Sequence, residues 1–155
     1  MSITPNQRAF LDTLAWAEGT DRPEVQKSNN KGYDVIVGGS LLTDYSKHPN
    51  KLVPLPRYKI SSTAAGRYQF IIKTWNTLKD RLKLPDFSPA SQDAACLELL
   101  RECGALARLA ENDFVGAVQK ARKIWASLPG AGYGQREQKL EALRDKYVAA
   151  GGTLA

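Results

Sequence analysis

Near its N-terminus the chain reads Thr4-Pro5-Asn6-Gln7-Arg8-Ala9-Phe10-Leu11-Asp12-Thr13-Leu14-Ala15-Trp16-Ala17-Glu18-Gly19. A threonine before a proline, with a glutamine at the third helical position, is a capping-box start. Leu11, Ala15 and Glu18 follow one another at helical spacing on one face. Gly19 is a typical helix stop. The pattern predicts an amphipathic helix that ends on a carboxylate.

Glu18 extends the otherwise apolar face of this helix. Burial disfavours an ionised carboxylate, and so does the negative end of the helix dipole. Both effects raise a pKa, so we expect Glu18 to keep its proton near neutral pH. A general acid that breaks a glycosidic bond needs this property. The alternative interpretation is a surface glutamate at a frayed helix end.

The composition indicates a folded chain without a metal or cofactor. A length of 155 residues fits one domain with its own core. No stretch approaches the roughly 20 apolar residues of a membrane span, and no signal peptide is evident. Cys96 and Cys103 lie about 10 Å apart along a predicted helix and cannot pair within it. With His48 as the one histidine, a zinc site is not expected.

Positive charge is concentrated in the middle of the chain. Nine basic residues and one acid, Asp80, lie between Lys47 and Lys83, whereas the range 93–113 holds five acids and two arginines. A basic surface favours an anionic partner such as nucleic acid, membrane headgroups or bacterial wall polymer. A solvated face without a partner is the alternative.

The rest of the chain predicts helices around a small β region. Tyr33–Val37 is rich in β-formers and precedes Gly38-Gly39, a hairpin-type turn signal. The range 45–62 contains prolines and lysines and is predicted to lack regular structure. Further helices are predicted over 71–82, from Ser88-Pro89 to Gly104, from Asn112-Asp113 to a point before Pro129, and around Leu140–Tyr147, closed by Gly151. The prediction is a single α-rich α+β domain.

Two glycine-punctuated segments have the composition of ligand-binding loops. They are Ala64-Ala65-Gly66-Arg67-Tyr68-Gln69 and Pro129-Gly130-Ala131-Gly132-Tyr133-Gly134-Gln135. Glycine permits close approach of the backbone, and tyrosine and glutamine can stack on sugar rings and bond their hydroxyls or acetamides. Neither is a phosphate loop, because no Gly-Lys-Ser/Thr follows. Ordinary helix connectors are the alternative.

Several segments together resemble the endolysins of lambda-like phages, in the same order and over nearly the full length. The segments are 6–12, 15–21 with Glu18, Gly32–Gly39, Gly66–Gln69, 86–89, 91–94 and Ile124–Gln135. The resemblance implies a lysozyme-like fold, mostly helical, with a small β-containing lobe and a substrate cleft between the lobes. It also implies cleavage of the β-1,4 bond between N-acetylmuramic acid and N-acetylglucosamine in peptidoglycan.

The resemblance further implies lytic transglycosylation, which leaves a 1,6-anhydro end and consumes no water. Glu18 matches the catalytic glutamate of the family. Tyr68, Gln69 and Tyr133 match residues that line the substrate groove, and Asp34 lies near it. One carboxylate suffices for this reaction, because the muramic acid C6 hydroxyl attacks within the same sugar. A hydrolytic muramidase that uses Glu18 and Asp34 is the nearest alternative. The possible second carboxylates in the sequence are Asp21, Glu24, Asp34 and Asp44.

The expected partners follow from the same resemblance. Peptidoglycan glycan strands are the expected substrate, with no nucleic acid and no stable membrane insertion, and a monomer is expected. The protein is expected to accumulate in the host cytoplasm and to reach the wall in the periplasm after a separate holin permeabilises the membrane. A more remote alternative is a non-catalytic module that binds wall polymer or nucleic acid through the basic stretch.

Overall fold

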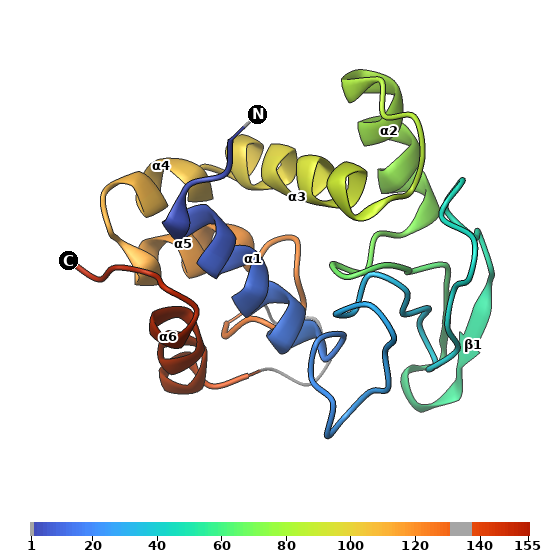
Figure 1. Ribbon diagram of the computed structural model, residues 1–155. Coiled ribbons are helices and arrows are strands. Elements are labelled where there is room, and N and C mark those ends of the chain that lie inside the picture. The colour runs from blue at the N-terminus through green and yellow to red at the C-terminus, as the bar shows by residue number, and fades with distance from the viewer. Residues whose placement is uncertain (1, 131–137) are drawn as a thin grey trace. The chain divides into compact units, whose positions relative to one another are not determined.

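The computed structural model describes residues 2–130 and 138–155, and this part of the chain is mostly helical (Figure 1). The helices are α1 (Pro5–Glu18), α2 (Ile72–Leu82), α3 (Pro89–Cys103), α4 (Ala105–Ala110), α5 (Phe114–Ala121) and α6 (Leu140–Ala149). A two-stranded antiparallel sheet is formed by β1 (Val53–Leu55) and β2 (Ile60–Ser62).

Helix α1 begins and ends where the sequence pattern predicts. The Gln7 backbone N–H donates to Thr4 Oγ1 at 3.1 Å, and the Thr4 N–H donates to Gln7 Oε1 at 3.1 Å. These reciprocal bonds are the predicted capping box. Leu11 and Ala15 have no exposed surface, and Gly19 ends the helix with a φ of +80°.

The chain divides into two compact units. The first consists of Met1–Ala17 and Leu97–Ala155, and the second of Glu18–Cys96. In the first unit Phe10 meets Phe114 and Tyr147 with ring centroids 6.1 and 6.3 Å apart. The Asn6 amide donates to the Leu109 carbonyl at 2.8 Å, and its oxygen accepts from the N–H of Thr153 at 3.0 Å. The C-terminal segment is therefore bonded to the start of α1.

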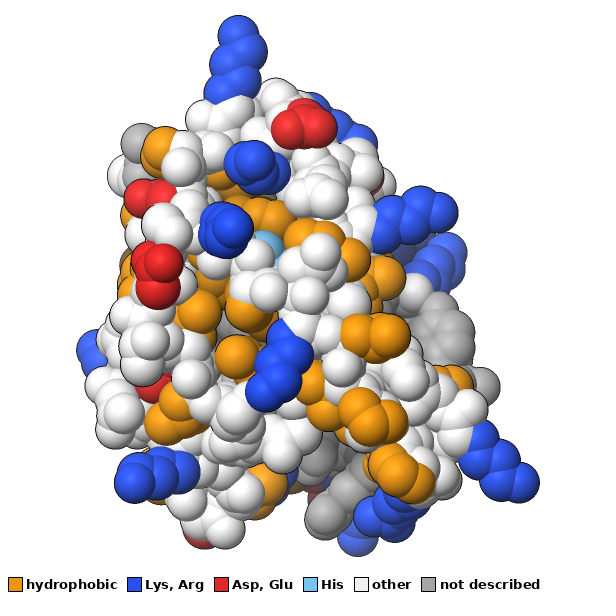
Figure 2. Space-filling model, turned by 90° about the vertical axis from the view of Figure 1, so that its right-hand side faces the viewer, with side chains coloured by type: hydrophobic (Ala, Val, Ile, Leu, Met, Phe, Trp, Pro, Cys, Tyr) orange, Lys and Arg blue, Asp and Glu red, His pale blue; other side chains and the backbone are white. Residues whose placement is uncertain are grey.

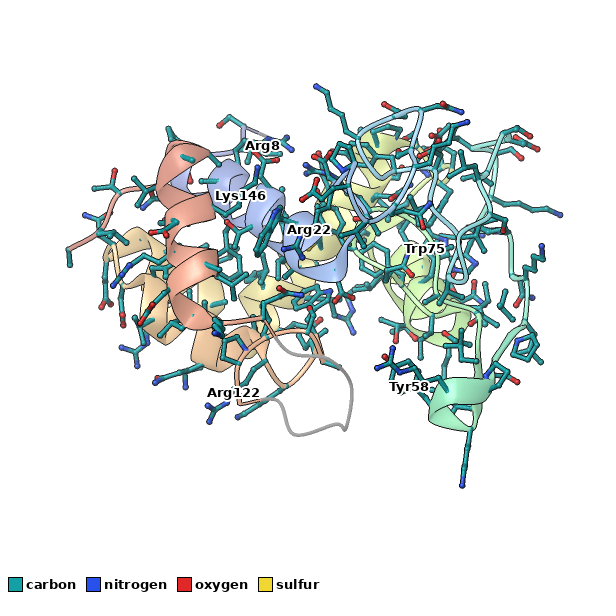
Figure 3. All side chains as sticks on the ribbon, turned by 90° about the horizontal axis from the view of Figure 1, so that it is seen from below. Arg8, Arg22, Tyr58, Trp75, Arg122 and Lys146 are labelled. Carbon is teal, nitrogen blue, oxygen red and sulfur yellow. The ribbon has the colours of Figure 1, made fainter. Side chains whose placement is uncertain are left out.

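The second unit has an aromatic core of its own. Trp75 on α2, labelled in Figure 3, is 1% exposed. Its ring lies 4.7 Å from that of Phe87 and 5.5 Å from that of Phe70. These contacts pack α2 against the segments on either side of it in the sequence.

The sheet of the second unit lies inside the range 45–62, so the prediction that this range lacks regular structure is wrong. Val53 pairs with Ser62 and Leu55 pairs with Ile60. A 3-10 turn, Pro56–Tyr58, connects the strands, and Figure 3 labels its Tyr58. Pro54 is tolerated in β1 because both strands of a two-stranded sheet are edge strands.

The predicted β-rich segment Tyr33–Val37 forms isolated bridges rather than a strand. Val35 pairs with Leu41 and Ile36 with Ala65. The turn after it forms as expected, because the Gly39 N–H donates to the Ile36 carbonyl at 3.0 Å. The sequence pattern also missed the short helix α4, and α5 ends at Ala121, before the expected position.

Cys96 is buried and Cys103 partly buried, and both are thiols. In the described part of the chain, no helix combines the length and the hydropathy that a membrane crossing needs.

Candidate functional site

Glu18, the last residue of α1, belongs to the second unit and is partly buried. Gly19 then reverses the chain, and Thr20 enters the core with only 2% of its surface exposed. The Thr20 hydroxyl donates to the carbonyl oxygen of Arg67 at 2.6 Å. The turn after the predicted catalytic residue is therefore bonded to the first of the two glycine-punctuated segments.

Gly32 contacts this turn from a second side. Its φ is +90°, and a methyl group at this position would lie 2.8 Å from both atoms of the Thr20 carbonyl group. Backbone atoms cannot move aside as a flexible side chain can. A residue without a Cβ is therefore required where the 28–33 loop passes the Glu18–Asp21 turn.

Arg67 is the buried cation of this unit, with 3% of its surface exposed. Its Nη2 donates to Asp21 Oδ2 at 2.9 Å, its Nε donates to the Lys31 carbonyl at 2.9 Å, and its Nη1 lies 3.3 Å from the Tyr68 hydroxyl. The Arg67 backbone N–H donates to Gln92 Oε1 at 2.9 Å. One residue thus connects the Glu18–Asp21 turn, the 28–33 loop and α3.

Asp93 on α3 accepts hydrogen bonds from two tyrosines on one carboxylate oxygen. The Tyr33 hydroxyl lies at 2.8 Å and the Tyr68 hydroxyl at 2.5 Å. Burial raises the pKa of the Tyr33 hydroxyl, and the negative charge of Asp93 raises it further. Burial likewise raises the pKa of Tyr68 well above its ordinary value. Both phenols therefore stay neutral donors to the carboxylate.

Asp34 is buried, with 2% of its surface exposed, and it organises the loop that precedes it. One carboxylate oxygen accepts from the Ser28 hydroxyl, and the other accepts from the Asn29 N–H at 2.9 Å. Ser28 Oγ in turn accepts from the Gly32 N–H at 2.7 Å. The carboxylate thus closes the 28–33 loop that contacts Thr20.

Tyr68 and Gln69 lie next to each other but in different environments. Tyr68 has no exposed surface, whereas Gln69 is partly exposed. Gln69 has a φ of +56°, an uncommon conformation for a residue with a side chain. Its amide nitrogen donates to the carbonyl of Gly66 at 2.8 Å and lies 3.3 Å from that of Val35. Among the described residues, no group donates to its amide oxygen.

The structure brings Glu18, Asp34, Tyr68 and Gln69 into one compact unit. Tyr133 and most of the second glycine-punctuated segment lie outside the described residues. Arg67 belongs to that first segment, but no sequence pattern indicated a role for it, for Thr20 or for Asp93. Arg67 and Asp21 are 46 residues apart, so no local spacing indicates their pairing. In the described residues, no group of acidic, histidine or cysteine side chains has the arrangement of a metal site.

A hollow of about 430 Å³ also opens on the second unit, lined by residues of the 46–50 loop and of α2. Figure 2 shows the pale blue of the chain's one histidine among hydrophobic side chains, with cationic side chains nearby. His48 Nδ1 accepts from the Asn50 N–H at 2.9 Å, so Nε2 carries the proton and donates to the Phe70 carbonyl at 2.8 Å. Lys47, Lys79 and Asp86 are the charged residues of the lining.

Comparison with known proteins places these features in a family. The family model described as Endolysin matches residues 8–154. The chain is 52% identical to the endolysin of Escherichia phage lambda over 154 residues, which cover 99% of this chain and 96% of that protein. It is 46% identical to the endolysin of Escherichia phage P2, with 97% and 95% covered.

Solved structures agree with the sequence relatives. The structure of bacteriophage lambda lysozyme complexed with a chitohexasaccharide has a TM-score of 0.95 and 51% identity, and the match covers 100% of this chain and 99% of that one. A second structure of lysozyme from bacteriophage lambda has a TM-score of 0.90 and 49% identity over the same shares. The fold is that of lambda lysozyme, and the chain belongs to the endolysin family.

Proposed function

We propose that this protein degrades bacterial peptidoglycan as a lytic transglycosylase during host cell lysis. The bond cleaved is the β-1,4 linkage from N-acetylmuramic acid to N-acetylglucosamine. The related lambda lysozyme has been solved with a chitohexasaccharide, a chain of β-1,4-linked amino sugars, which supports a glycan substrate here. Identity of 52% over nearly the whole chain supports a shared activity.

Glu18 is the proposed catalytic residue. In its protonated form it transfers its proton to the glycosidic oxygen as the bond from C1 of muramic acid to that oxygen breaks. The resulting carboxylate then takes the proton of the C6 hydroxyl while O6 forms a bond to C1 of the same sugar. Glu18 ends protonated again, and no water is consumed. The intramolecular hydroxyl replaces an enzyme nucleophile.

The bonding of the other carboxylates is the observation that favours transglycosylation over hydrolysis. Hydrolysis needs a second carboxylate that reaches the sugar or a water molecule. Asp34 is buried and bonded to Ser28 and Asn29, and Asp21 is bonded to Arg67. The Asp44 carboxylate accepts from the N–H and the hydroxyl of Ser46 at 2.9 and 3.0 Å. Asp21, Asp34 and Asp44 are therefore each bonded to a near neighbour. Glu24, the fourth candidate, has a 68% exposed side chain and lies 3.4 Å from Arg22 Nε.

The proposed binding residues differ in how they act. Gln69 offers its amide oxygen to a hydroxyl or acetamide N–H of the glycan, because its amide nitrogen is already bonded to the backbone. Tyr133 is proposed to contact the glycan on the basis of family resemblance. Asp34 and Tyr68 are buried, so we assign them support of the groove through the 28–33 loop and through Asp93.

The proposed biology follows from family membership. The enzyme works as a monomer on glycan strands, uses no cofactor or metal, and reaches the wall from the host cytoplasm once a separate holin has opened the membrane. Nucleic acid is not a proposed partner.

Mass spectrometry of the fragments released from purified peptidoglycan tests the reaction. Muropeptides one water lighter than the reducing-end species support transglycosylation. Ordinary reducing ends would mean hydrolysis, and Asp34→Asn and Asp44→Asn would then identify the second carboxylate. Absence of any release would reject an enzymatic role and favour a binding module.

Glu18→Gln tests the residue assignment. The amide keeps the shape of the side chain but cannot donate a proton as a carboxylic acid does, so turnover is expected to disappear while the circular dichroism spectrum and wall binding stay unchanged. Glu24→Gln, at an exposed glutamate in the same unit, is the matched control and should keep full activity. Activity of Glu18→Gln near that of the control would reject Glu18 as the acid.

A further inference from the structure

We infer that Arg67 is a positioning residue for Glu18, acting through both its backbone and its guanidinium group. The inference rests on the proposed function, in which Glu18 transfers the proton. Arg67 does not itself belong to the residues predicted to contact the glycan, and its role follows from its bonds to the turn that carries Glu18.

Two of these bonds reach the Glu18–Asp21 turn directly. The Arg67 carbonyl accepts from the Thr20 hydroxyl at 2.6 Å, and Nη2 donates to Asp21 Oδ2 at 2.9 Å. Thr20 and Asp21 are the second and third residues after Glu18. Only Gly19 lies between Glu18 and this bonded pair. A shift of Arg67 would therefore also displace the Glu18 carboxylate, because one intervening residue can absorb little of the movement.

The other side of the guanidinium is equally constrained. Its Cζ lies 5.2 Å from the centroid of the Tyr33 ring and 5.7 Å from that of Tyr68, both within cation–π range. The hydroxyls of both tyrosines are bonded to the same oxygen of Asp93. The cation is thus enclosed by two aromatic rings whose ends are themselves bonded to α3.

Gln69 follows Arg67 by two residues in the chain, so the same segment also places the proposed binding residue. The Gln69 N–H donates to the Gly66 carbonyl at 3.2 Å, closing a tight turn around Arg67 and Tyr68. Arg67 therefore connects the proton donor with the residue that we propose to bind the sugar. Displacement of reacting groups by about 1 Å can cost about 10²-fold in rate.

Lysine cannot replace the arginine in this role. A guanidinium group donates from several nitrogens at fixed angles, and here it reaches Asp21, the Lys31 carbonyl and the Tyr68 hydroxyl at once. An ammonium group is a single centre on a flexible stem. Arg67→Lys keeps the charge that balances Asp21 but loses the geometry.

The test measures kcat and KM on defined glycan strands for Arg67→Lys and Thr20→Val. Thr20→Val removes the hydroxyl bond to Arg67 and preserves the volume of a buried side chain. We expect kcat to fall by about 10²-fold for Arg67→Lys and by about tenfold for Thr20→Val. KM should stay within about twofold of the parent, because both substitutions alter bonds to the Glu18–Asp21 turn and leave the bonds from the Gln69 amide to the Gly66 and Val35 carbonyls in place. Thr20→Ser, which retains the hydroxyl, should recover most of the turnover.

Leu78→Ala is the control for loss of stability. Leu78 is a buried residue of α2 in the same unit, outside the bonds described above. All rates are measured at a temperature at which circular dichroism shows each variant to be folded. The control should lower Tm while leaving kcat near that of the parent.

The inference is rejected if Arg67→Lys and Thr20→Val retain parental kcat while folded, or if Leu78→Ala loses as much kcat as they do. A rise in KM at constant kcat would also reject it, because Arg67 would then serve binding alone. Failure of the proposed function looks different, since the unmodified protein would then release no 1,6-anhydro products.

Discussion

At the scale of single residues, three buried tyrosines differ in what their hydroxyl groups meet. Those of Tyr33 and Tyr68 donate to Asp93. The Tyr147 hydroxyl is buried in the first unit, and among the described residues it has no hydrogen-bond partner. A buried polar group without a partner costs about 1–3 kcal/mol of stability.

Tyr147→Phe is therefore expected to leave the free energy of unfolding unchanged or to raise it by about 1 kcal/mol. Tyr33→Phe removes a donor from the buried carboxylate of Asp93 and should lower it by about 1.5–3 kcal/mol. Urea denaturation followed by circular dichroism measures both. The explanation fails if the two substitutions have equal effects.

The buried His48 is expected to make the stability of the protein depend on pH. Burial lowers its pKa below the ordinary value of 6.5, and protonation of Nδ1 would break the bond from the Asn50 N–H. The unfolded chain then takes up a proton near pH 6.5 that the folded chain does not bind, so this contribution is complete above pH 6.5 and falls as the pH is lowered.

His48→Gln should remove that dependence. We expect the difference in Tm between the parent and His48→Gln to shrink as the pH is lowered from about 7.5 towards 5, because only the parent loses stability through this group. Thermal melts at closely spaced pH values measure it. A difference in Tm that stays constant would show that His48 keeps its ordinary pKa.

At the scale of elements, the loops of the second unit are shaped by contacts that only glycine permits. Gly32 has a positive φ, and a Cβ at this position would lie 2.8 Å from the backbone carbonyl group of Thr20. Gly151, after α6, also has a positive φ, of +102°, but a Cβ there would meet no atom within 4 Å. Alanine at Gly151 would therefore introduce backbone strain alone, whereas alanine at Gly32 would introduce both backbone strain and steric overlap.

Gly151→Ala is expected to cost about 1 kcal/mol, the strain of a side chain in the left-handed region. Gly32→Ala adds overlap with a rigid backbone, so its cost should exceed that of the control by about 1–3 kcal/mol. It should also lower kcat, because the displaced backbone is that of the Glu18–Asp21 turn. Paired denaturation curves and turnover measurements decide the point, and equal costs would rule out the overlap.

At the scale of the whole molecule, the net charge of +6 favours an anionic substrate. Much of the excess lies between Lys47 and Lys83, and two of these lysines, Lys47 and Lys79, line the hollow of the second unit. Charges on the surface attract a polymer over about 10 Å at 0.1 M salt and only about 3 Å at 1 M.

The double variant Lys47→Gln with Lys79→Gln should therefore lower the rate on intact anionic walls at low salt, with the deficit disappearing near 1 M. Rates on short neutral oligosaccharides should stay the same. Lys139→Gln with Arg144→Gln removes the same charge from exposed positions in the first unit and serves as the control. Equal losses in both double variants would mean that net charge matters and its location does not.

Local sequence determined most of the helices, because caps and apolar periodicity involve residues within one or two turns of each other. The start and end of α1 and the glycines after α3 and α6 follow from such signals. Similarity along the whole chain likewise determined the family. The fold and Glu18 as the candidate acid could thus be predicted from the sequence alone.

Tertiary structure decided the features that depend on distant residues. The strands β1 and β2 are three residues long and depend on pairing with each other, and the prolines of the 45–62 range therefore led to a wrong prediction of irregular structure. The pairing of Arg67 with Asp21 and of Asp93 with two tyrosines spans 25 to 60 positions in the chain. Hydrogen bonds over such separations leave no local periodicity, because the backbone between them only has to return to the same place.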